Sequence, residues 1–262
     1  MLKLYHSINS VCAQKVRIAL AEKGQQAQDH IMTLRGDQYE PAYLKLNPNG
    51  VVPTLVHNGV PITESALILY YIEDVFPEPP LMPKEPRARH RVRMYNKLID
   101  EYVHNSCTIL TFATAFRPAF LKMAREAWQA EIAKSPLKRR VEYKRSVIEH
   151  RLDSEFVVDA LEQHNKLLSW MVDSLKSSQY LAGDSFSIAE CAVIPYILRL
   201  ELLKLDALWD RYPDIANWWT RMRARPSVKA AIFDRMAEAD WVPFKNLAPD
   251  PWPKVQALLK AA

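Results

Sequence analysis

Ser10 and Cys12 place a hydroxyl and a thiol at the point where a helix is expected to begin. Residues 2–6 predict a short strand before them, and the apolar spacing after them predicts a helix. A helix N-terminus carries unpaired amide groups and a partial positive charge, so it stabilises an anion such as a thiolate. Taken alone, the pair favours a simpler interpretation, a helix cap and a small buried side chain. The downstream sequence reverses that preference.

A proline-containing loop follows at residues 46–56, with the sequence Leu-Asn-Pro-Asn-Gly-Val-Val-Pro-Thr-Leu-Val. Pro53 stands immediately before an apolar strand, where a proline marks a strand entry or an edge because it cannot donate to a central ladder. The bond from Val52 to Pro53 is of the X–Pro type, one of the few that can be cis. The loop therefore predicts an exposed backbone segment next to a strand.

The residues after this strand predict a hairpin and a helix. Asn-Gly at 58–59 is typical of a tight turn, and residues 60–62 predict the returning strand. Thr-Glu-Ser at 63–65 predicts a cap for a helix over residues 66–76, whose apolar side chains recur at the helical period. The predicted order is βαβ, a linking loop, and then ββα.

Three motifs in this order resemble the glutathione transferase superfamily. They are Ser-x-Cys at the first helix, Asn-Pro-x-x-x-Val-Pro-Thr-Leu before the third strand, and Glu-Ser at the following helix. The resemblance implies an α/β, thioredoxin-like N-terminal domain (βαβ–ββα) followed by an all-α C-terminal domain, which together make the glutathione transferase fold. We expect the glutathione-binding domain at residues 1–80 and the helical substrate-binding domain at residues 87–262.

The resemblance also implies which residues hold glutathione, the expected co-substrate. The tripeptide has two carboxylates, one ammonium and a thiol that must be ionised near neutral pH. Glu64 is expected to bind the γ-glutamyl ammonium, and Ser65 with nearby helix amides its carboxylate. The backbone of Val52, exposed by a cis Pro53, is expected to pair with the cysteinyl moiety. Ser10 is expected to donate to the thiolate.

The presence of Cys12 makes the motif compatible with more than one reaction. Ser-x-Cys resembles the zeta-class isomerases and the related reductive dehalogenases of chlorinated hydroquinones, in which the cysteine forms or resolves a mixed disulfide with glutathione. The isomerase motif continues with Trp-Arg-Val-Arg, whereas residues 14–17 here are Gln-Lys-Val-Arg. Residues 73–78, residues 97–102 and the charged middle region resemble instead the bacterial β-etherases, which use glutathione to displace an aryl ether from lignin-derived ketones.

We therefore expect a glutathione transferase whose thiolate attacks a hydrophobic, aromatic electrophile, with β-aryl ether cleavage as the leading reaction. The alternatives are a reductive dehalogenase or a cis-trans isomerase that uses Cys12, and a non-catalytic homologue that only binds ligands. The leading reaction predicts a part in the degradation of aromatic compounds. The family resemblance further implies a homodimer.

Composition narrows the class of protein. The chain has 262 residues, of which 49% are hydrophobic and 25% charged, which is ordinary for a soluble protein with ample core material. Only five glycines argue against a glycine-loop nucleotide fold. Cys12, Cys107 and Cys191 are too far apart for a zinc motif or a disulfide framework, which favours a reducing compartment. No signal peptide and no apolar run long enough for a bilayer is present, so we expect a cytoplasmic protein without a membrane partner.

The formal charge of +5 raises the question of a nucleic-acid partner. Basic residues cluster at 87–93 and 138–145, but acidic residues return soon after each cluster. This pattern favours solvated helix faces over a nucleic-acid groove. We therefore expect a small-molecule substrate and no nucleic acid.

Five prolines within residues 77–86 predict a stiff linker between the two domains. A long helix is expected over residues 87–115. Phenylalanines at spacing four from Phe112 follow, and Pro118 among them predicts a kink or a break. This aromatic stripe fits a core and a wall of the substrate cleft equally well.

Further helices are expected over residues 125–134 and 139–174. Ser-Ile-Ala-Glu at 187–190 predicts a capping box, in which a serine hydroxyl and a glutamate side chain each bind an amide at the helix start. Cys191 inside the helix that follows is interpreted as a packing residue. The tail, residues 241–262, is an extension that we expect over the cleft.

Overall fold

The computed structural model describes residues 1–245 and 247–261. Its first third folds as alternating strands and helices. These elements are β1 (Leu2–His6), α1 (Val11–Glu22), β2 (Gln28–Ile31), α2 (Pro41–Leu44), β3 (Thr54–His57), β4 (Val60–Ile62) and α3 (Ser65–Val75). The βαβ–ββα order expected from the sequence is confirmed.

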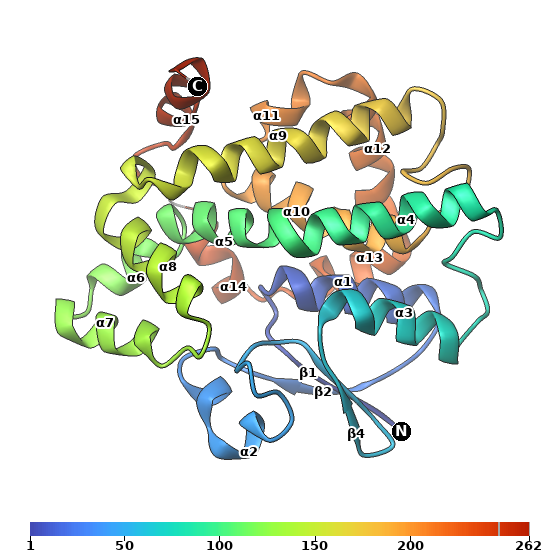
Figure 1. Ribbon diagram of the computed structural model, residues 1–262, viewed down its shortest axis with the longest axis horizontal. Coiled ribbons are helices and arrows are strands. Elements are labelled where there is room, and N and C mark those ends of the chain that lie inside the picture. The colour runs from blue at the N-terminus through green and yellow to red at the C-terminus, as the bar shows by residue number, and fades with distance from the viewer. Residues whose placement is uncertain (246, 262) are drawn as a thin grey trace.

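The four strands form one mixed sheet in the order β2-β1-β3-β4. Strand β1 is parallel to β2 and antiparallel to β3, and β3 is antiparallel to β4. Figure 1 shows α1 and α3 between this sheet and the helices of the rest of the chain. Helix α1 packs against α3 and also against α10 and α13, so it lies at the junction of the sheet and the helical part.

Strand register brings the two predicted reactive loops together. Tyr5 pairs with Thr54 across β1 and β3, so Pro53 lies beside the carboxyl end of β1. The chain leaves β1 there and turns through residues 7–10 into α1. The bond between Val52 and Pro53 is cis, as the sequence predicts.

The remainder of the described chain is helical and packs around a core that includes Trp218, Tyr95 and Tyr196. Its helices are α4 (Pro86–Leu98), α5 (His104–Ala113), α6 (Arg117–Leu121), α7 (Arg125–Ala133), α8 (Lys138–His150), α9 (Phe156–Leu175), α10 (Ile188–Leu202), α11 (Ala207–Asp210), α12 (Pro213–Ala224), α13 (Pro226–Ala231), α14 (Glu238–Lys245) and α15 (Trp252–Ala261). One hydrophobic cluster runs from β1 and α1 through these helices. The division into residues 1–80 and 87–262 stays a prediction.

Two of the predicted helices differ from the structure. The single helix over 87–115 is α4 and α5 joined by a π-helical turn, Ile99–Val103, and it ends at Ala113. The break predicted near Pro118 is present, since α6 begins only at Arg117. The single helix over 139–174 is wrong, because Arg151 takes a left-handed conformation (φ 55°) that separates α8 from α9. Neither glycine nor proline marks this break.

The two predicted helix caps also have different outcomes. The capping box is confirmed: the Ser187 hydroxyl accepts a hydrogen bond from the Ala189 amide (3.2 Å), and the Glu190 carboxylate accepts one from the Ser187 amide (2.9 Å). The cap predicted for α3 is wrong. Its N-cap is Glu64, which makes no side-chain capping bond and has a φ of 63°. Across the described residues, no helix combines the length and the hydropathy that crossing a bilayer requires.

Candidate functional site

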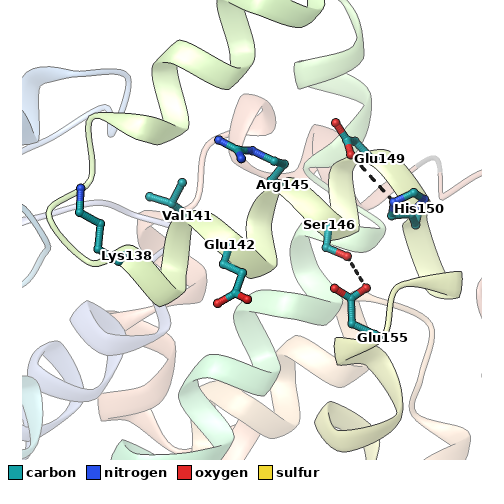
Figure 2. A pocket seen from close by; sticks show the side chains of 8 residues that line it. All are labelled: Lys138, Val141, Glu142, Arg145, Ser146, Glu149, His150 and Glu155. Carbon is teal, nitrogen blue, oxygen red and sulfur yellow. Dashed lines mark hydrogen bonds and ion pairs between the residues drawn. The ribbon is translucent and has the colours of Figure 1, made fainter.

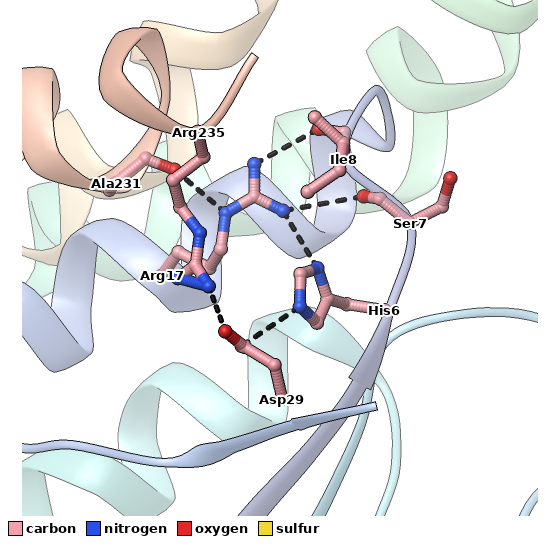
Figure 3. Close-up of polar contacts among 7 residues, drawn as sticks. All are labelled: His6, Ser7, Ile8, Arg17, Asp29, Ala231 and Arg235. Carbon is pink, nitrogen blue, oxygen red and sulfur yellow. Dashed lines mark hydrogen bonds and ion pairs between the residues drawn. The ribbon is translucent and has the colours of Figure 1, made fainter. Parts of the chain in front are cut away.

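Two buried arginines hold the loop that leads from β1 into α1. The Arg17 guanidinium donates to the carbonyls of Ser7 (3.3 Å) and Ile8 (3.0 Å), as Figure 3 shows. Arg199, on α10, donates to the next carbonyl, that of Asn9 (2.6 Å). Three successive carbonyl groups are therefore fixed by one side chain from the sheet part of the chain and one from the helical part. These hydrogen bonds fix the position of the residue that follows, Ser10.

Arg17 is itself part of a polar chain that joins the sheet to the end of the helical part (Figure 3). It donates to Nδ1 of His6 (3.0 Å) and to the carbonyl of Ala231 (2.7 Å). His6 Nε2 lies 3.0 Å from the carboxylate of Asp29, which also pairs with Arg235. Burial, together with the charge of Arg17, lowers the pKa of His6 to about 4. A neutral His6 thus accepts from Arg17 and donates to Asp29.

Ser10 is the N-cap of α1, as its position in the sequence predicts. Its hydroxyl oxygen accepts a hydrogen bond from the amide of Ala13 (3.3 Å), and its side chain is half-buried. A hydroxyl has one hydrogen to donate and two lone pairs to accept. Because the bond from Ala13 uses a lone pair, the hydrogen of Ser10 is available to an anion at the helix N-terminus.

Two side chains hold the backbone of the loop before β3 by hydrogen bonds. The Tyr43 hydroxyl (2.6 Å) and the Asn47 amide (2.9 Å) both donate to the carbonyl of Val51. Within the part of the chain that the structure describes, the backbone N–H and C=O of Val52 make no hydrogen bond to the protein. With Pro53 in the cis conformation next to it, Val52 has a backbone edge that a peptide ligand could pair with.

Glu64 and Ser65 lie at the start of α3, which is the predicted γ-glutamyl site. The Glu64 side chain is exposed, and its carboxylate accepts a hydrogen bond from the Asn49 side chain (3.3 Å), which links it to the loop before β3. Ser65 is buried. The Glu64 carboxylate can pair with an ammonium group, and the free amides at the N-terminus of α3 can bind a carboxylate. Together these groups can bind an amino acid.

Cys12 is buried at the interface with the helical part of the chain. Its sulfur lies 3.4 Å from Nδ1 of His104 and 3.8 Å from the Tyr196 hydroxyl. Burial alone would raise the pKa of Cys12, but the charge and hydrogen bond of His104, the charge of Lys15 and a hydrogen bond from Ser65 outweigh it and lower the pKa to about 6. The structure thus brings Cys12 close to Ser65 and gives it a thiolate near neutral pH.

The other two cysteines differ from Cys12. Burial raises the pKa of Cys107 to about 11, and it raises that of Cys191 well above the usual value. Both thiols are fully enclosed by the core. This agrees with the interpretation of Cys191 as a packing residue.

The residue immediately before the C-terminal tail contacts the loop that precedes Ser10. The Asn9 side chain donates to the carbonyl of Asp240 (3.0 Å), just inside α14. Phe244 of α14 contacts Phe116 with ring centroids 5.9 Å apart, and the guanidinium of Arg199 lies over both rings. Helix α15, in contrast, packs against α9. Residues 246 and 262 of the tail lie outside the described residues.

Two residues of the basic cluster at 138–145, Lys138 and Arg145, line a groove of about 420 Å³ along α8 (Figure 2). Carboxylates alternate with the basic side chains in this groove, among them Glu149, which pairs with Arg125, and Glu155, which accepts from Ser146 (2.7 Å). Such a mixed surface is not the continuous positive potential that a phosphate backbone requires. The groove contains none of the predicted site residues.

His104 and Tyr196 are site residues that the sequence reasoning did not identify. Tyr196 is a polar side chain in a largely apolar helix, which is its one local signal, whereas His104 begins a helix in which half of the residues are polar and has no such signal. Lys15 is a third: it is fully buried on α1, and within the described residues its ammonium has no hydrogen-bond partner. Buried polar groups without partners are rare in proteins and call for an explanation.

Two family models match the chain. The one described as "Glutathione S-transferase, N-terminal domain" matches residues 4–80, and the one described as "Glutathione S-transferase, C-terminal domain" matches residues 137–226. The first match covers α1, α3, strands β2 to β4, most of β1 and all six predicted site residues.

The chain is similar over most of its length to two curated proteins. It is 26% identical to Protein LigF of Sphingobium sp. strain SYK-6 over 94% of this chain and 98% of that protein. It is 27% identical to glutathione S-transferase TCHQD of Arabidopsis thaliana, over 88% of this chain and 89% of that protein. The crystal structure of β-etherase LigF superposes with a TM-score of 0.79 and 25% identity, covering 90% of this chain and 99% of that one.

Proposed function

This chain belongs to the glutathione S-transferase family, whose members use glutathione as co-substrate, and we propose that it is an enzyme that cleaves β-aryl ethers. In the proposed reaction the glutathione thiolate attacks the carbon that carries the aryloxy group. A carbon–sulfur bond forms, the carbon–oxygen bond breaks, and a phenolate leaves with the bonding electrons. The protein's part is to ionise the thiol and to orient the two reactants.

The observation that carries this proposal is the available hydroxyl hydrogen of Ser10 at the N-terminus of α1. A glutathione thiolate beside it receives a hydrogen bond and the favourable field of the helix. Because Arg17 and Arg199 already hold the preceding loop, little reordering is needed when glutathione binds. The donor is thus preorganised for the charge that it stabilises.

The rest of glutathione is assigned to the residues that the sequence predicts. Glu64 binds the γ-glutamyl ammonium, and Ser65 with the first amides of α3 binds the γ-glutamyl carboxylate. The backbone of Val52, next to the cis Pro53, pairs with the cysteinyl moiety. Val52 and Pro53 directly precede β3, which pairs with the carboxyl end of β1, and Asn49 links the loop before β3 to Glu64 at the start of α3.

The ether-cleaving subtype is supported by the similarity to LigF, which extends over nearly the whole of both chains. We propose a hydrophobic aromatic substrate and a part in the degradation of aromatic compounds. The homodimer and the cytoplasmic location that we expect from the sequence stay predictions.

A panel of electrophiles tests the proposal: an aryl ether of an aromatic ketone, a chlorohydroquinone and chlorodinitrobenzene, each with glutathione. We expect ether cleavage that falls by about one to three orders of magnitude in Ser10→Ala, the effect of one lost anion-stabilising donor. Cys12→Ala should keep most of this activity. Ser7→Ala, which removes a hydroxyl from the same loop, is the matched control. Ether cleavage that survives in Ser10→Ala at the wild-type rate would contradict the proposed mechanism.

A second candidate function uses Cys12, because its contacts with His104 favour a reactive thiol. In that case the protein is a reductive dehalogenase or a cis-trans isomerase, and Cys12→Ser should abolish turnover of the chlorohydroquinone or of the isomerase substrate. Mass spectrometry of the wild type should then detect a disulfide between Cys12 and glutathione. If no electrophile reacts and bound glutathione titrates like free glutathione, the protein is a ligand-binding homologue instead.

A further inference from the structure

We propose that His104, on the first turn of α5, is a positioning residue that holds Cys12 as a thiolate, with Lys15 as a buried counter-charge. The site then contains a second sulfur nucleophile, one assembled across the interface between the sheet and the helical part of the chain. The use of this nucleophile with glutathione rests on the proposed function. The ionisation of Cys12 does not depend on it.

The sulfur of Cys12, the imidazole of His104 and the hydroxyl of Tyr196 lie close together. Cys12 Sγ lies 3.4 Å from Nδ1 and 3.8 Å from Nε2 of His104, so it remains in contact with a ring nitrogen in either tautomer. The Tyr196 hydroxyl lies 3.2 Å from the same Nδ1 and 3.8 Å from the sulfur. The rings of His104 and Tyr196 meet edge to face at 89°. Tyr196 therefore limits the movement of the imidazole on the side facing α10.

Lys15 gives an independent reason to place a negative charge here. It follows Cys12 by three positions on α1, so both side chains emerge from the same face of the helix. Its ammonium is fully buried without a hydrogen-bond partner among the described residues. A buried charge is costly unless an opposite charge faces it. The positive charge of Lys15 lowers the pKa of Cys12 and so favours the thiolate form of Cys12.

The other groups around Cys12 do not supply that negative charge. Ser65 of α3 offers only a hydroxyl. Burial raises the pKa of Cys107 on α5 to about 11, and burial with the charge of Cys12 raises the pKa of Tyr196 on α10 well above its usual value. Asp100, a carboxylate in the π-helical turn, acts on Tyr196 and is not among the groups that act on Cys12. Cys12 is thus the thiol in this cluster whose anion is stabilised at neutral pH.

The π-helical turn Ile99–Val103 ends immediately before His104. Such a turn holds one residue more than an α-helical turn, so it rotates the following helix by about 100° relative to the preceding one. Single π-helical turns of this kind are frequent at functional sites. Here the rotation accompanies the placement of an imidazole, rather than an apolar side chain, against the start of α1.

The test is a pH titration of the thiolate by its ultraviolet absorbance, on folded protein without glutathione or electrophile. The signal of Cys12 is the difference between wild type and Cys12→Ala, and it needs no reagent to reach the buried sulfur. We expect a midpoint near 6 in the wild type. His104→Gln keeps a polar side chain but removes the imidazole, and it should raise the midpoint by about one pH unit or more.

Lys15→Met should also raise the midpoint, and it provides a second variant in case His104→Gln does not fold. Tyr196→Phe keeps the ring and is the matched control, with a midpoint expected within about half a pH unit of the wild type. A wild-type midpoint near the ordinary thiol value of about 8.5 overturns the proposal. An unchanged midpoint in both His104→Gln and Lys15→Met overturns it as well. Because no substrate is present, a failed search for ether cleavage leaves this result unaffected, and the reverse also holds.

Discussion

Glu64 combines a backbone conformation that destabilises the fold with a carboxylate that we assign to glutathione. Its φ of 63° and ψ of 104° lie in a region that residues with a Cβ rarely adopt. Such a conformation costs on the order of 1–3 kcal/mol and persists where the surrounding structure imposes it. A glycine adopts positive φ at little cost. We therefore expect Glu64→Gly to make the protein more stable while it weakens the binding of glutathione.

The change in stability and the change in affinity for glutathione can be calculated separately. Glycine relieves the strain but makes the unfolded chain more flexible, a cost of roughly 0.5–1 kcal/mol, so the net gain in the free energy of unfolding is about 1 kcal/mol. Hydrogen bonds to charged groups contribute about 1.5–3 kcal/mol. Because Glu64 is exposed before glutathione covers it, we take about 2 kcal/mol, which is a roughly 30-fold rise in Kd.

The measurements are urea unfolding for stability and calorimetric titration for the affinity of glutathione. Glu64→Gln is the matched control, because it keeps the Cβ, the strain and a hydrogen-bonding side chain but removes the charge. It should lose affinity without gaining stability, and Glu64→Ala should do the same. Ser65→Ala should weaken binding through the other end of the γ-glutamyl group.

Two results would refute this reasoning. If Glu64→Gly unfolds at a lower urea concentration than the wild type with an unchanged slope, the backbone at this position is not strained. If Glu64→Gly, Glu64→Gln and Ser65→Ala all bind glutathione with wild-type affinity, the γ-glutamyl site lies elsewhere. Because stability and affinity are expected to move in opposite directions, a general loss of structure cannot imitate the expected result.

Two further predictions concern stability. Ser187→Ala removes the cap of α10 and should lower the free energy of unfolding by about 0.5–2 kcal/mol with unchanged glutathione affinity, whereas an unchanged urea midpoint would mean that the cap is not needed. Burial lowers the pKa of both His6 and His164 to about 4, below the 6.5 expected in the unfolded chain, so the unfolded state binds more protons and stability falls as the pH drops from about 6.5 towards 4. The loss in the free energy of unfolding should reach roughly 3 kcal/mol for each histidine. Urea melts between these pH values should show a smaller loss in His164→Gln than in the wild type. Equal losses in the two proteins would contradict the lowered pKa of His164.

The features that the sequence predicts correctly are those with a local cause. An X–Pro bond is one of the few that can be cis, and the resemblance of the motif around Pro53 implies that this one is; a serine followed by a glutamate at the third position indicates the capping box at Ser187. Both depend on a few neighbouring residues. The break at Arg151 has no such cause, because arginine rarely adopts a positive φ and a periodic apolar pattern continues on either side. Only packing in the folded protein imposes it.

The surroundings of Cys12 depend on long-range contacts. His104 and Tyr196 lie 92 and 184 positions away along the chain. The π-helical turn before His104 also changes which face of α5 meets α1, and the apolar period of α4 does not reveal this shift. Sequence spacing therefore identifies the thiol but not its partners.

Helix α10 nevertheless carries a signal for the site. Residues 188–200 are all buried, so each polar side chain among them needs a partner to offset the cost of its burial. Tyr196 and Arg199 are three positions apart, which places them on one face of the helix. Tyr196 contacts Cys12 and His104, and Arg199 donates to the Thr111 hydroxyl and to the carbonyl that precedes Ser10. A single face of α10 thus supports both candidate reactive groups, which explains why an apolar helix far along the chain keeps a phenol and a guanidinium in its interior.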